Sequence, residues 1–143
     1  KVYLKVLDYT EDPGPRYKRQ DKDGTTTSGE MFYVLRLNAA FVDCLEGNKE
    51  LVLMLDEVSG YPSSFLDEAI GELVYDFTRE KVESILTFDT LMFKRRAKQV
   101  GDETYPQWEE KRVKKTRVVH SSGINATLKR LADDGTIEEY TIE

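Results

Sequence analysis

The stretch from Glu50 to Phe77, ELVLMLDEVSGYPSSFLDEAIGELVYDF, combines a buried strand, a polar elbow and an amphipathic helix. Residues 51–55 form a continuous apolar run that is bounded by charge and too short for a helix of its own. Such a run is typical of a strand that is covered on both faces, as in an α/β sheet. The apolar face of the helix consists of Phe65, Leu66, Ala69, Ile70, Leu73 and Phe77. The stretch therefore predicts an α/β fold, with the elbow at the carboxyl end of a strand, where open α/β sheets usually place functional groups.

Apolar runs and turn residues predict the other elements of the first 115 residues. Strands are expected at residues 2–7, 31–37 and 81–88. A short helix is expected at residues 39–45, capped by Asn38 and stopped by Gly47-Asn48. A further helix is expected between residues 91 and 115, interrupted near Gly101 and Pro106. Residues 8–30 are rich in glycine, proline and charge, so they are expected to form a long loop or a hairpin extension with its tip at Lys22-Asp23-Gly24. Ser64 is expected to cap the helix after the elbow, with Asp67 three residues later as an approximate capping box.

The last 28 residues, 116–143, are treated as an extension that follows a domain of residues 1–115. Val118-Val119 could form a strand, and residues 124–132 are predicted to form an amphipathic helix. The alternative is a β-hairpin about Asp134-Gly135 with Arg130 opposite Glu139.

Composition limits the classes of protein that the chain can belong to. It has 143 residues, of which 39% are hydrophobic and 34% charged, and a formal net charge of -6. No apolar run approaches the roughly 20 residues that span a bilayer, so no membrane partner is expected. The start of the chain lacks a signal-peptide pattern, and the single Cys44 cannot form an internal disulfide, which together favour a cytoplasmic location.

The elbow resembles the STAS domain, which is the fold of bacterial anti-sigma factor antagonists. In those proteins a strand ends in an apolar residue and Asp, a valine follows, and an Asp-Ser-Ser-Gly turn opens a helix. Here Leu55-Asp56 is followed by Val58, and Pro62-Ser63-Ser64-Phe65 occupies the turn. The continuation is similar to the motif of the STAS-like domain family of unknown function. That motif is matched by Ser64-Phe65-Leu66-Asp67-Glu68-Ala69, Gly71 and Leu73.

The resemblance covers residues 50–90, and the order of elements extends it to about residues 31–115. It implies a STAS-like mixed β-sheet of four to five strands packed with helices, to which the tail would add a C-terminal α/β extension. Ser63 falls on the position that is phosphorylated in the antagonists. Pro62 replaces the motif's Asp and Phe65 its Gly, which departs from the pattern that a partner kinase would meet.

The resemblance implies a non-enzymatic signalling or regulatory module that docks a protein partner through the strand–elbow–helix surface. Tyr61, Ser63, Ser64, Asp67 and Glu68 are expected on that surface, and Ser63 and Ser64 are the candidate phospho-acceptors. The implied partner is a kinase-like ATPase or a sigma-regulatory protein. A plain N-cap with its neighbour is the structural alternative for the serine pair.

Two basic segments support a different hypothesis, a regulatory protein that binds nucleic acid. They contain Lys94, Arg95, Arg96, Lys98, Lys111, Arg112, Lys114 and Lys115. Tyr105 and Trp108 lie between the segments and are expected to be available for base stacking. A solvated basic face, or one that meets an acidic partner, is the competing interpretation, and the net charge gives no general reason to expect nucleic acid.

Enzymatic and metal chemistry find little support in the sequence. The pairs Asp56-Glu57 and Asp67-Glu68 could approach each other across the elbow, but neither has a histidine or cysteine beside it, and acidic first turns are ordinary in helices. His120 is the only histidine, which excludes a His-rich metal site, and a triad of His120 with Ser121 or Ser63 is a guess without geometry. Gly60 and Gly71 do not match a phosphate-binding loop. No catalytic residue, cofactor or metal is therefore expected.

Overall fold

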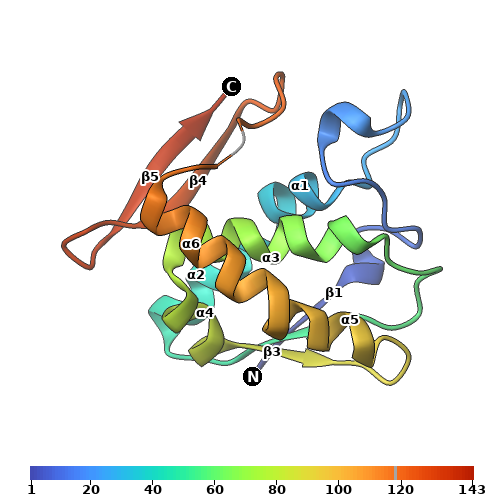
Figure 1. Ribbon diagram of the computed structural model, residues 1–143, viewed down its shortest axis with the longest axis horizontal. Coiled ribbons are helices and arrows are strands. Elements are labelled where there is room, and N and C mark those ends of the chain that lie inside the picture. The colour runs from blue at the N-terminus through green and yellow to red at the C-terminus, as the bar shows by residue number, and fades with distance from the viewer. Residues whose placement is uncertain (118) are drawn as a thin grey trace.

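A small parallel sheet lies against the helices, and a separate hairpin packs beside them (Figure 1). The structure is a computed structural model that describes residues 1–117 and 119–143. The strands β1 (Val2–Lys5), β2 (Leu51–Met54) and β3 (Leu86–Asp89) pair in that order, and both pairs are parallel. Residues 51–53 of the central strand are buried, as their apolar run predicts. The α/β class is confirmed, although the sheet has three parallel strands rather than four to five mixed ones.

The helix α3 (Ser63–Phe77) lies at the centre of the molecule, between α1 (Gly29–Phe32) and α6 (Tyr105–Lys114) (Figure 1). All six residues of its predicted apolar face are buried, so the periodicity is confirmed. Two glycines allow close packing on its two sides. A Cβ atom on Gly29 would lie 2.4 Å from the backbone oxygen of Phe65, and one on Gly71 would lie 2.0 Å from the Trp108 ring.

The predicted strand at 31–37 is wrong, because these residues are helical. They belong to α1 and to the π-helical segment η3 (Tyr33–Leu37), which continues directly into α2 (Asn38–Gly47). Ser28 starts this long helix, since its side chain accepts a hydrogen bond from the Met31 backbone N–H at 3.2 Å. Aromatic and branched residues favour strands only weakly, and here the burial of their side chains in a helical arrangement overrides that preference. Asn38 lies inside the helix rather than at a cap, whereas the stop at Gly47-Asn48 is confirmed by the left-handed backbone of Asn48 (φ 52°).

The chain after α3 is more helical than the sequence predicts. Residues 79–85 form α4 (Arg79–Ile85), so the strand expected at 81–88 is confirmed only as β3. Thr78 caps α4, because its side chain accepts from the Lys81 backbone N–H at 3.3 Å. The helix expected between 91 and 115 is confirmed as α5 (Lys94–Gln99), the π-helical segment η4 (Val100–Thr104) and α6, which follow one another without a break.

The tail forms a hairpin instead of the preferred helix at 124–132. The strands β4 (Ala126–Leu131) and β5 (Ile137–Ile142) are antiparallel, and the turn between them contains Gly135 with φ 87°. The hairpin alternative was thus correct, but Arg130 pairs with Glu138 rather than Glu139. The C-terminal α/β extension is therefore a β-hairpin in the described residues. Of the strand proposed at Val118-Val119, Val118 lies outside the described residues and Val119 is not in a strand.

Residues 8–30 form a loop and not a hairpin extension. Two short 3-10 turns, η1 (Val6–Asp8) and η2 (Lys18–Gln20), shape this part of the chain. The expected turn at 22–24 is present, with Gly24 at φ 78° and the Thr25 backbone N–H donating to the Lys22 carbonyl at 3.0 Å. None of the helices formed by residues 1–117 and 119–143 is both long enough and apolar enough to cross a membrane.

Candidate functional site

The elbow between β2 and α3 is bound to the loop between β3 and α5 by one carboxylate. Asp56, just after β2, accepts hydrogen bonds from the Thr90 hydroxyl at 2.5 Å and from the backbone N–H groups of Leu91 at 2.7 Å and Met92 at 3.2 Å. Burial opposes ionisation, but these bonds prevail and lower the pKa of Asp56. An ionised Asp56 therefore fixes the Thr90 side chain and the backbone of Leu91 and Met92 against the elbow.

This loop presents two large apolar side chains to solvent. Leu91 is 80% exposed and Met92 is 75% exposed. The residue that follows them, Phe93, packs edge-on against Tyr61 of the elbow, with ring centroids 4.9 Å apart. Tyr61 is itself held by its hydroxyl, which donates to the Leu55 carbonyl at 2.6 Å. Tyr61 is buried, so it packs beneath the exposed residues of the elbow and is not itself accessible to a partner.

The serine pair opens α3 at the edge of this surface. The helix begins at Ser63 and its N-cap is Pro62, which has no side-chain hydrogen bond, so the prediction that Ser64 caps the helix is wrong. Ser63 is exposed and Ser64 is half-buried. Ser63 lines a cavity of about 190 Å³, called here the Ser63 cavity, whose other lining residues include Arg16 and Arg96.

The two acidic residues predicted beside the serines have different surroundings. Asp67 also lines the Ser63 cavity and accepts hydrogen bonds from Arg16 at 2.8 Å, Thr104 at 2.8 Å and Trp108 at 3.2 Å. Glu68 is only 2% exposed and accepts from Arg16 at 3.3 Å. Burial and the neighbouring Glu72 raise the pKa of Glu68 to about 9, although Arg16 opposes the shift. Asp67 thus reaches the cavity, whereas Glu68 lies in the interior.

The basic residues of α5 remain largely exposed. Lys94, Arg95 and Lys98 face solvent, while Arg96 is half-buried and donates to Gln99 at 3.1 Å. Lys98 pairs with Asp102 at 2.6 Å. Lys94 and Arg95 follow the exposed Leu91 and Met92 in the chain, so the apolar side chains have positive charge beside them.

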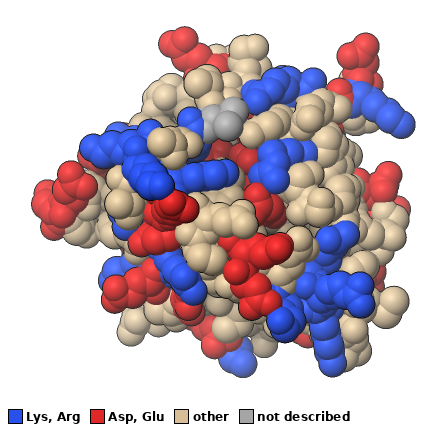
Figure 2. Space-filling model, in the orientation of Figure 1, with Lys and Arg blue, Asp and Glu red and all other residues tan. Residues whose placement is uncertain are grey.

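The basic residues of α6 are closely matched by acidic ones. Arg112 pairs with Glu109 at 2.6 Å and Lys114 with Glu110 at 2.5 Å, and Figure 2 shows blue and red side chains interspersed over this side of the molecule. Lys111 lies over the Trp108 ring at 4.2 Å from its centroid, and Lys115 is the exposed residue that ends the helix.

The expectation that two aromatic residues could stack on bases is wrong. Tyr105 is 6% exposed and Trp108 is 3% exposed, and Trp108 packs against Gly71 of α3. Both rings form part of the hydrophobic core, where no base could reach them.

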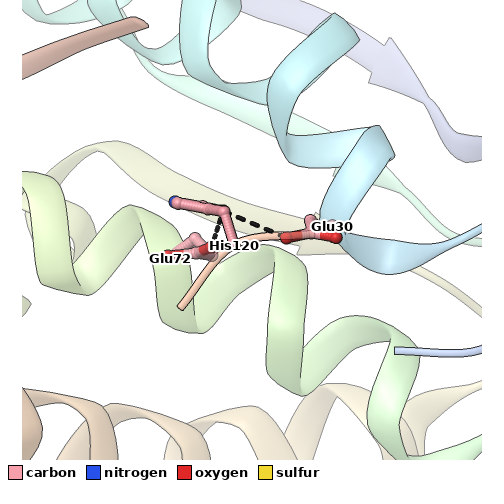
Figure 3. Close-up of side chains that lie close together, drawn as sticks. All are labelled: Glu30, Glu72 and His120. Carbon is pink, nitrogen blue, oxygen red and sulfur yellow. Dashed lines mark hydrogen bonds and ion pairs between the residues drawn. The ribbon is translucent and has the colours of Figure 1, made fainter. Parts of the chain in front are cut away.

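A second cluster of polar side chains lies where α1 and the segment after α6 pack against α3. Glu30 of α1, Glu72 of α3 and His120 of the segment after α6 point toward one another (Figure 3). His120 Nδ1 lies 3.0 Å from an oxygen of Glu30 and 3.4 Å from an oxygen of Glu72. Ser121 donates to Glu30 through both its hydroxyl at 2.7 Å and its backbone N–H at 3.1 Å. This arrangement does not support a catalytic triad of His120 with Ser121, because the Ser121 hydroxyl donates to Glu30 and not to His120.

Strong donors hold the carboxylates of this cluster. Burial alone would raise the pKa of Glu30, but hydrogen bonds from His120, Ser121 and the Lys18 backbone lower it to about 2. Arg117 pairs with Glu72 at 2.5 Å and lies 3.8 Å from Asp76.

Asp76 extends the cluster along α3. The hydroxyls of Tyr33 and Tyr140 both donate to it at 2.5 Å. Burial nevertheless raises the pKa of Asp76 to about 6, against the effect of these two bonds. The hairpin is therefore attached to α3 through a buried carboxylate.

Sequence reasoning missed Glu30, Glu72, Asp76 and Arg117. A signal for part of the cluster was present, because Glu68, Glu72 and Asp76 recur every four residues and so share one face of α3. Nothing comparable marks Glu30 or Arg117, whose positions depend on how α1 and the tail pack. The predicted approach of Asp56 and Asp67 does not give them a shared partner, since Asp56 binds residues 90–92 and Asp67 binds Arg16, Thr104 and Trp108.

Residues 35–91 match the model of a family described as a STAS-like domain of unknown function. The matched segment runs from η3 through α2, β2, α3 and α4 to the end of β3, and it includes the elbow and both serines. No curated protein and no solved structure matches the chain.

Proposed function

Residues 35–91 carry a STAS-like domain, and from this premise we propose that the protein is a regulatory module that docks a protein partner without catalysis. The proposed contact area, called here the elbow surface, consists of the elbow at 56–64 without the buried Tyr61, and of the exposed residues Leu91, Met92, Lys94 and Arg95. It lies at the carboxyl edge of the parallel sheet, where α/β folds commonly bind ligands.

The observation that carries the proposal is the pair of exposed apolar side chains on a fixed loop. Leu91 and Met92 are exposed by 80% and 75%, while Asp56 holds their backbone through two N–H groups. Exposed apolar groups with a polar rim mark interaction sites, and Met adapts well to different partner surfaces. Because the loop is already held in place, docking would cost little ordering entropy.

The charge beside the apolar pair indicates the chemistry of the partner. Lys94 and Arg95 are exposed next to Leu91 and Met92. A complementary surface would present apolar side chains within an acidic rim, since matched charge steers association and excludes wrong partners. Resemblance to the STAS antagonists adds a kinase-like ATPase or a sigma-regulatory protein as the kind of partner to test.

Phosphorylation of Ser63 is proposed as the control of this docking, with Ser64 as the second candidate acceptor. A phosphate would add about -1.5 to -2 charges at the edge of the Ser63 cavity. Arg96 lines the same cavity and donates to Gln99, whereas Arg16 is already paired with Asp67 and Glu68. Arg96 is thus the arginine that a phosphate on Ser63 would recruit, and this movement would change the charge presented beside Lys94 and Arg95.

The test is a pull-down from native-host lysate with three chains: the wild type, Leu91→Ser/Met92→Ser, and Val113→Ser. Val113 is a matched control, because it is an apolar residue that is 66% exposed on α6, outside the elbow surface. We expect a protein partner that the wild type and the control retain and the double variant loses. Equal recovery by all three chains would contradict docking at this surface.

The second arm of the test measures that partner's affinity for Ser63→Ala and Ser63→Glu. We expect the two affinities to differ by about fivefold or more, which is about 1 kcal/mol. Equal affinities would remove the phosphate control and leave the docking intact.

Nucleic-acid binding through residues 94–98 and 111–117 has less support, since Tyr105 and Trp108 are buried. Nuclease-sensitive recovery of bound material, with a steep loss of affinity in added salt, would favour this alternative.

A further inference from the structure

We propose that Glu30, Glu72 and His120 bind a divalent transition-metal cation, which fastens the segment after α6 to the helices α1 and α3. The three residues come from three separate parts of the chain and converge in the interior (Figure 3). Glu30 and Glu72 are 0% and 1% exposed. Three such groups that approach one another away from water are uncommon, because buried charges require a partner.

The distances fit the coordination of a cation. Two ligands at about 2.1 Å from a metal ion lie about 3.0 Å apart at a right angle and about 3.4 Å apart at the tetrahedral angle. His120 Nδ1 lies 3.0 Å from Glu30 and 3.4 Å from Glu72. A proton on Nδ1 would form a good hydrogen bond to Glu30, but 3.4 Å is longer than normal for a second bond to Glu72. All three ligand atoms lie within 4.8 Å of one another, so a small movement of one carboxylate would close them around an ion.

The surrounding donors orient the two carboxylates. The second oxygen of Glu30 accepts from the Lys18 backbone N–H at 2.9 Å and from the Ser121 hydroxyl at 2.7 Å. The second oxygen of Glu72 accepts from Arg117 at 2.5 Å. Each carboxylate thus has one oxygen turned away from His120 and held by donors, while the other faces His120; in Glu30 the oxygen that faces His120 also accepts from the Ser121 backbone N–H at 3.1 Å. This is the arrangement that metal ligands commonly have around a bound ion.

The charge of the region also favours a cation. The side chains of Glu30, Glu72 and Asp76 are all buried, and Arg117 approaches Glu72 and Asp76. The carboxylates of Glu30, Glu72 and Asp76 thus outnumber the Arg117 guanidinium and the His120 imidazole beside them. A divalent ion between Glu30 and Glu72 would balance that excess.

A cavity of about 510 Å³ lies beside the site, on the side of His120 rather than of the two carboxylates. His120, Ser121 and Arg117 are among its lining residues. Solvent in this cavity could supply the remaining ligand, since zinc with three protein ligands usually keeps one position for water. An imidazole among the ligands favours Zn²⁺ over Mg²⁺ and Ca²⁺, which prefer oxygen ligands alone.

The experiment is calorimetric titration of the untagged, chelator-treated chain with Zn²⁺, with Mg²⁺ as the comparison ion. His120 is the only histidine, so ¹⁵N NMR of its ring reports on this site alone. We expect one Zn²⁺ per chain, a shift of the Nδ1 resonance on binding, a higher melting temperature, and no effect of Mg²⁺ at equal concentration. His120→Asn should weaken binding by about 100-fold or more, because even loss of an outer partner costs about 10- to 100-fold.

Two further variants keep the proposal testable if His120→Asn folds poorly. Ser121→Ala removes one donor to Glu30 and should weaken Zn²⁺ binding by about 10-fold or more. Cys44→Ser removes the chain's other soft ligand and should leave binding unchanged. Absence of stoichiometric Zn²⁺ binding, or binding that survives in His120→Asn and is lost in Cys44→Ser, would overturn the proposal in favour of a metal-free cluster joined by a proton.

Discussion

Glu68 and Glu72 are one helical turn apart on α3, and both side chains are buried, with 2% and 1% exposure. Two carboxylates in such a place cannot both ionise without a large electrostatic cost. Burial together with Glu72 raises the pKa of Glu68 to about 9, from 4.5. Glu68 therefore keeps its proton at neutral pH, and a side chain that sequence reasoning placed on a docking surface acts as a neutral group in the interior.

This proton makes the stability of the fold depend on pH. The folded protein holds a proton on Glu68 that the unfolded chain releases above about pH 4.5, so rising pH favours unfolding until about pH 9. We expect the free energy of unfolding to fall between pH 6.5 and 8.5, and the variant Glu68→Gln to remove most of that fall. At pH 8.5 the variant should be more stable than the wild type by at least about 1 kcal/mol.

Chemical denaturation at several pH values measures this effect. Glu80→Gln serves as the control, because Glu80 is an exposed acidic residue on α4, and its variant should keep the wild-type slope. The other two carboxyl groups with a shifted pKa affect this window less, because burial raises the pKa of Asp76 only to about 6 and hydrogen bonds lower that of Glu30 to about 2. Identical slopes for the wild type and Glu68→Gln would rule out a neutral Glu68.

At the scale of elements, the contact between α3 and α6 depends on a glycine. A Cβ atom at Gly71 would lie 2.0 Å from the Trp108 ring, so an alanine there would push the two helices apart or turn the ring. The indole also donates to Asp67 at 3.2 Å, and any shift of the ring would disturb that bond. The packing of α6 therefore also positions a residue of the Ser63 cavity.

Gly71→Ala should destabilise the fold by about 1–3 kcal/mol, the usual cost of overpacking a core. Gly101→Ala is the matched control. Gly101 also lies in a helical segment, η4, but a Cβ atom there would meet no other atom within 4 Å. It should be neutral or slightly stabilising, since alanine limits the unfolded chain more than glycine does. Thermal unfolding of both variants decides the matter, and equal melting temperatures would contradict the close packing.

The elements that the sequence predicted well are those with an unambiguous local pattern. The apolar run at 51–55 and the helical periodicity of residues 65–77 each identify one structure, and both are confirmed. The segment 31–37 is apolar and aromatic without a clear period, so only its burial against α3 decides that it is helical. The tail fits both a helix and a hairpin locally, and long-range contacts decide between them.

In the candidate sites, too, features that depend on local sequence could be predicted, and features that depend on contacts between distant segments could not. The elbow and the exposure of Ser63 follow from a local turn and could be predicted, whereas the burial of Glu68 and Tyr61 depends on Arg16 and Phe93 from other segments. The cluster of Glu30, Glu72 and His120 joins residues that are far apart in the chain, so no spacing in the sequence indicates it.

At the scale of the whole molecule, polar contacts join the hairpin to the α/β part. The Asn38 side chain donates to the Lys129 carbonyl at 2.9 Å and accepts from the Lys129 backbone N–H at 3.1 Å. It thereby pairs with one residue of β4 as a neighbouring strand would. Leu128 beside it is 2% exposed and joins the core of the helical part. The hairpin is thus integrated with the rest of the fold.

Asn38→Ala should loosen this attachment by about 2 kcal/mol, because two partly buried backbone groups lose their partners. Hydrogen exchange should speed up in residues 126–142 more than in the parallel sheet. Thr141→Ala, at an exposed position of β5, is the control and should exchange like the wild type. Uniform acceleration over both regions would indicate general destabilisation and contradict a local attachment.

The buried row of carboxylates on α3 has a consequence for how the chain is made. Arg16 and Tyr33 precede α3, but the partners Arg117, His120 and Tyr140 lie 40 or more residues later, so the ribosome produces α3 well before these three groups. While the chain grows, Glu72 lacks Arg117 and His120, and Asp76 has the Tyr33 hydroxyl but lacks Tyr140 and Arg117, which opposes the burial of both carboxylates. The first three quarters of the chain must therefore wait, incompletely packed, until the last quarter has emerged from the exit tunnel.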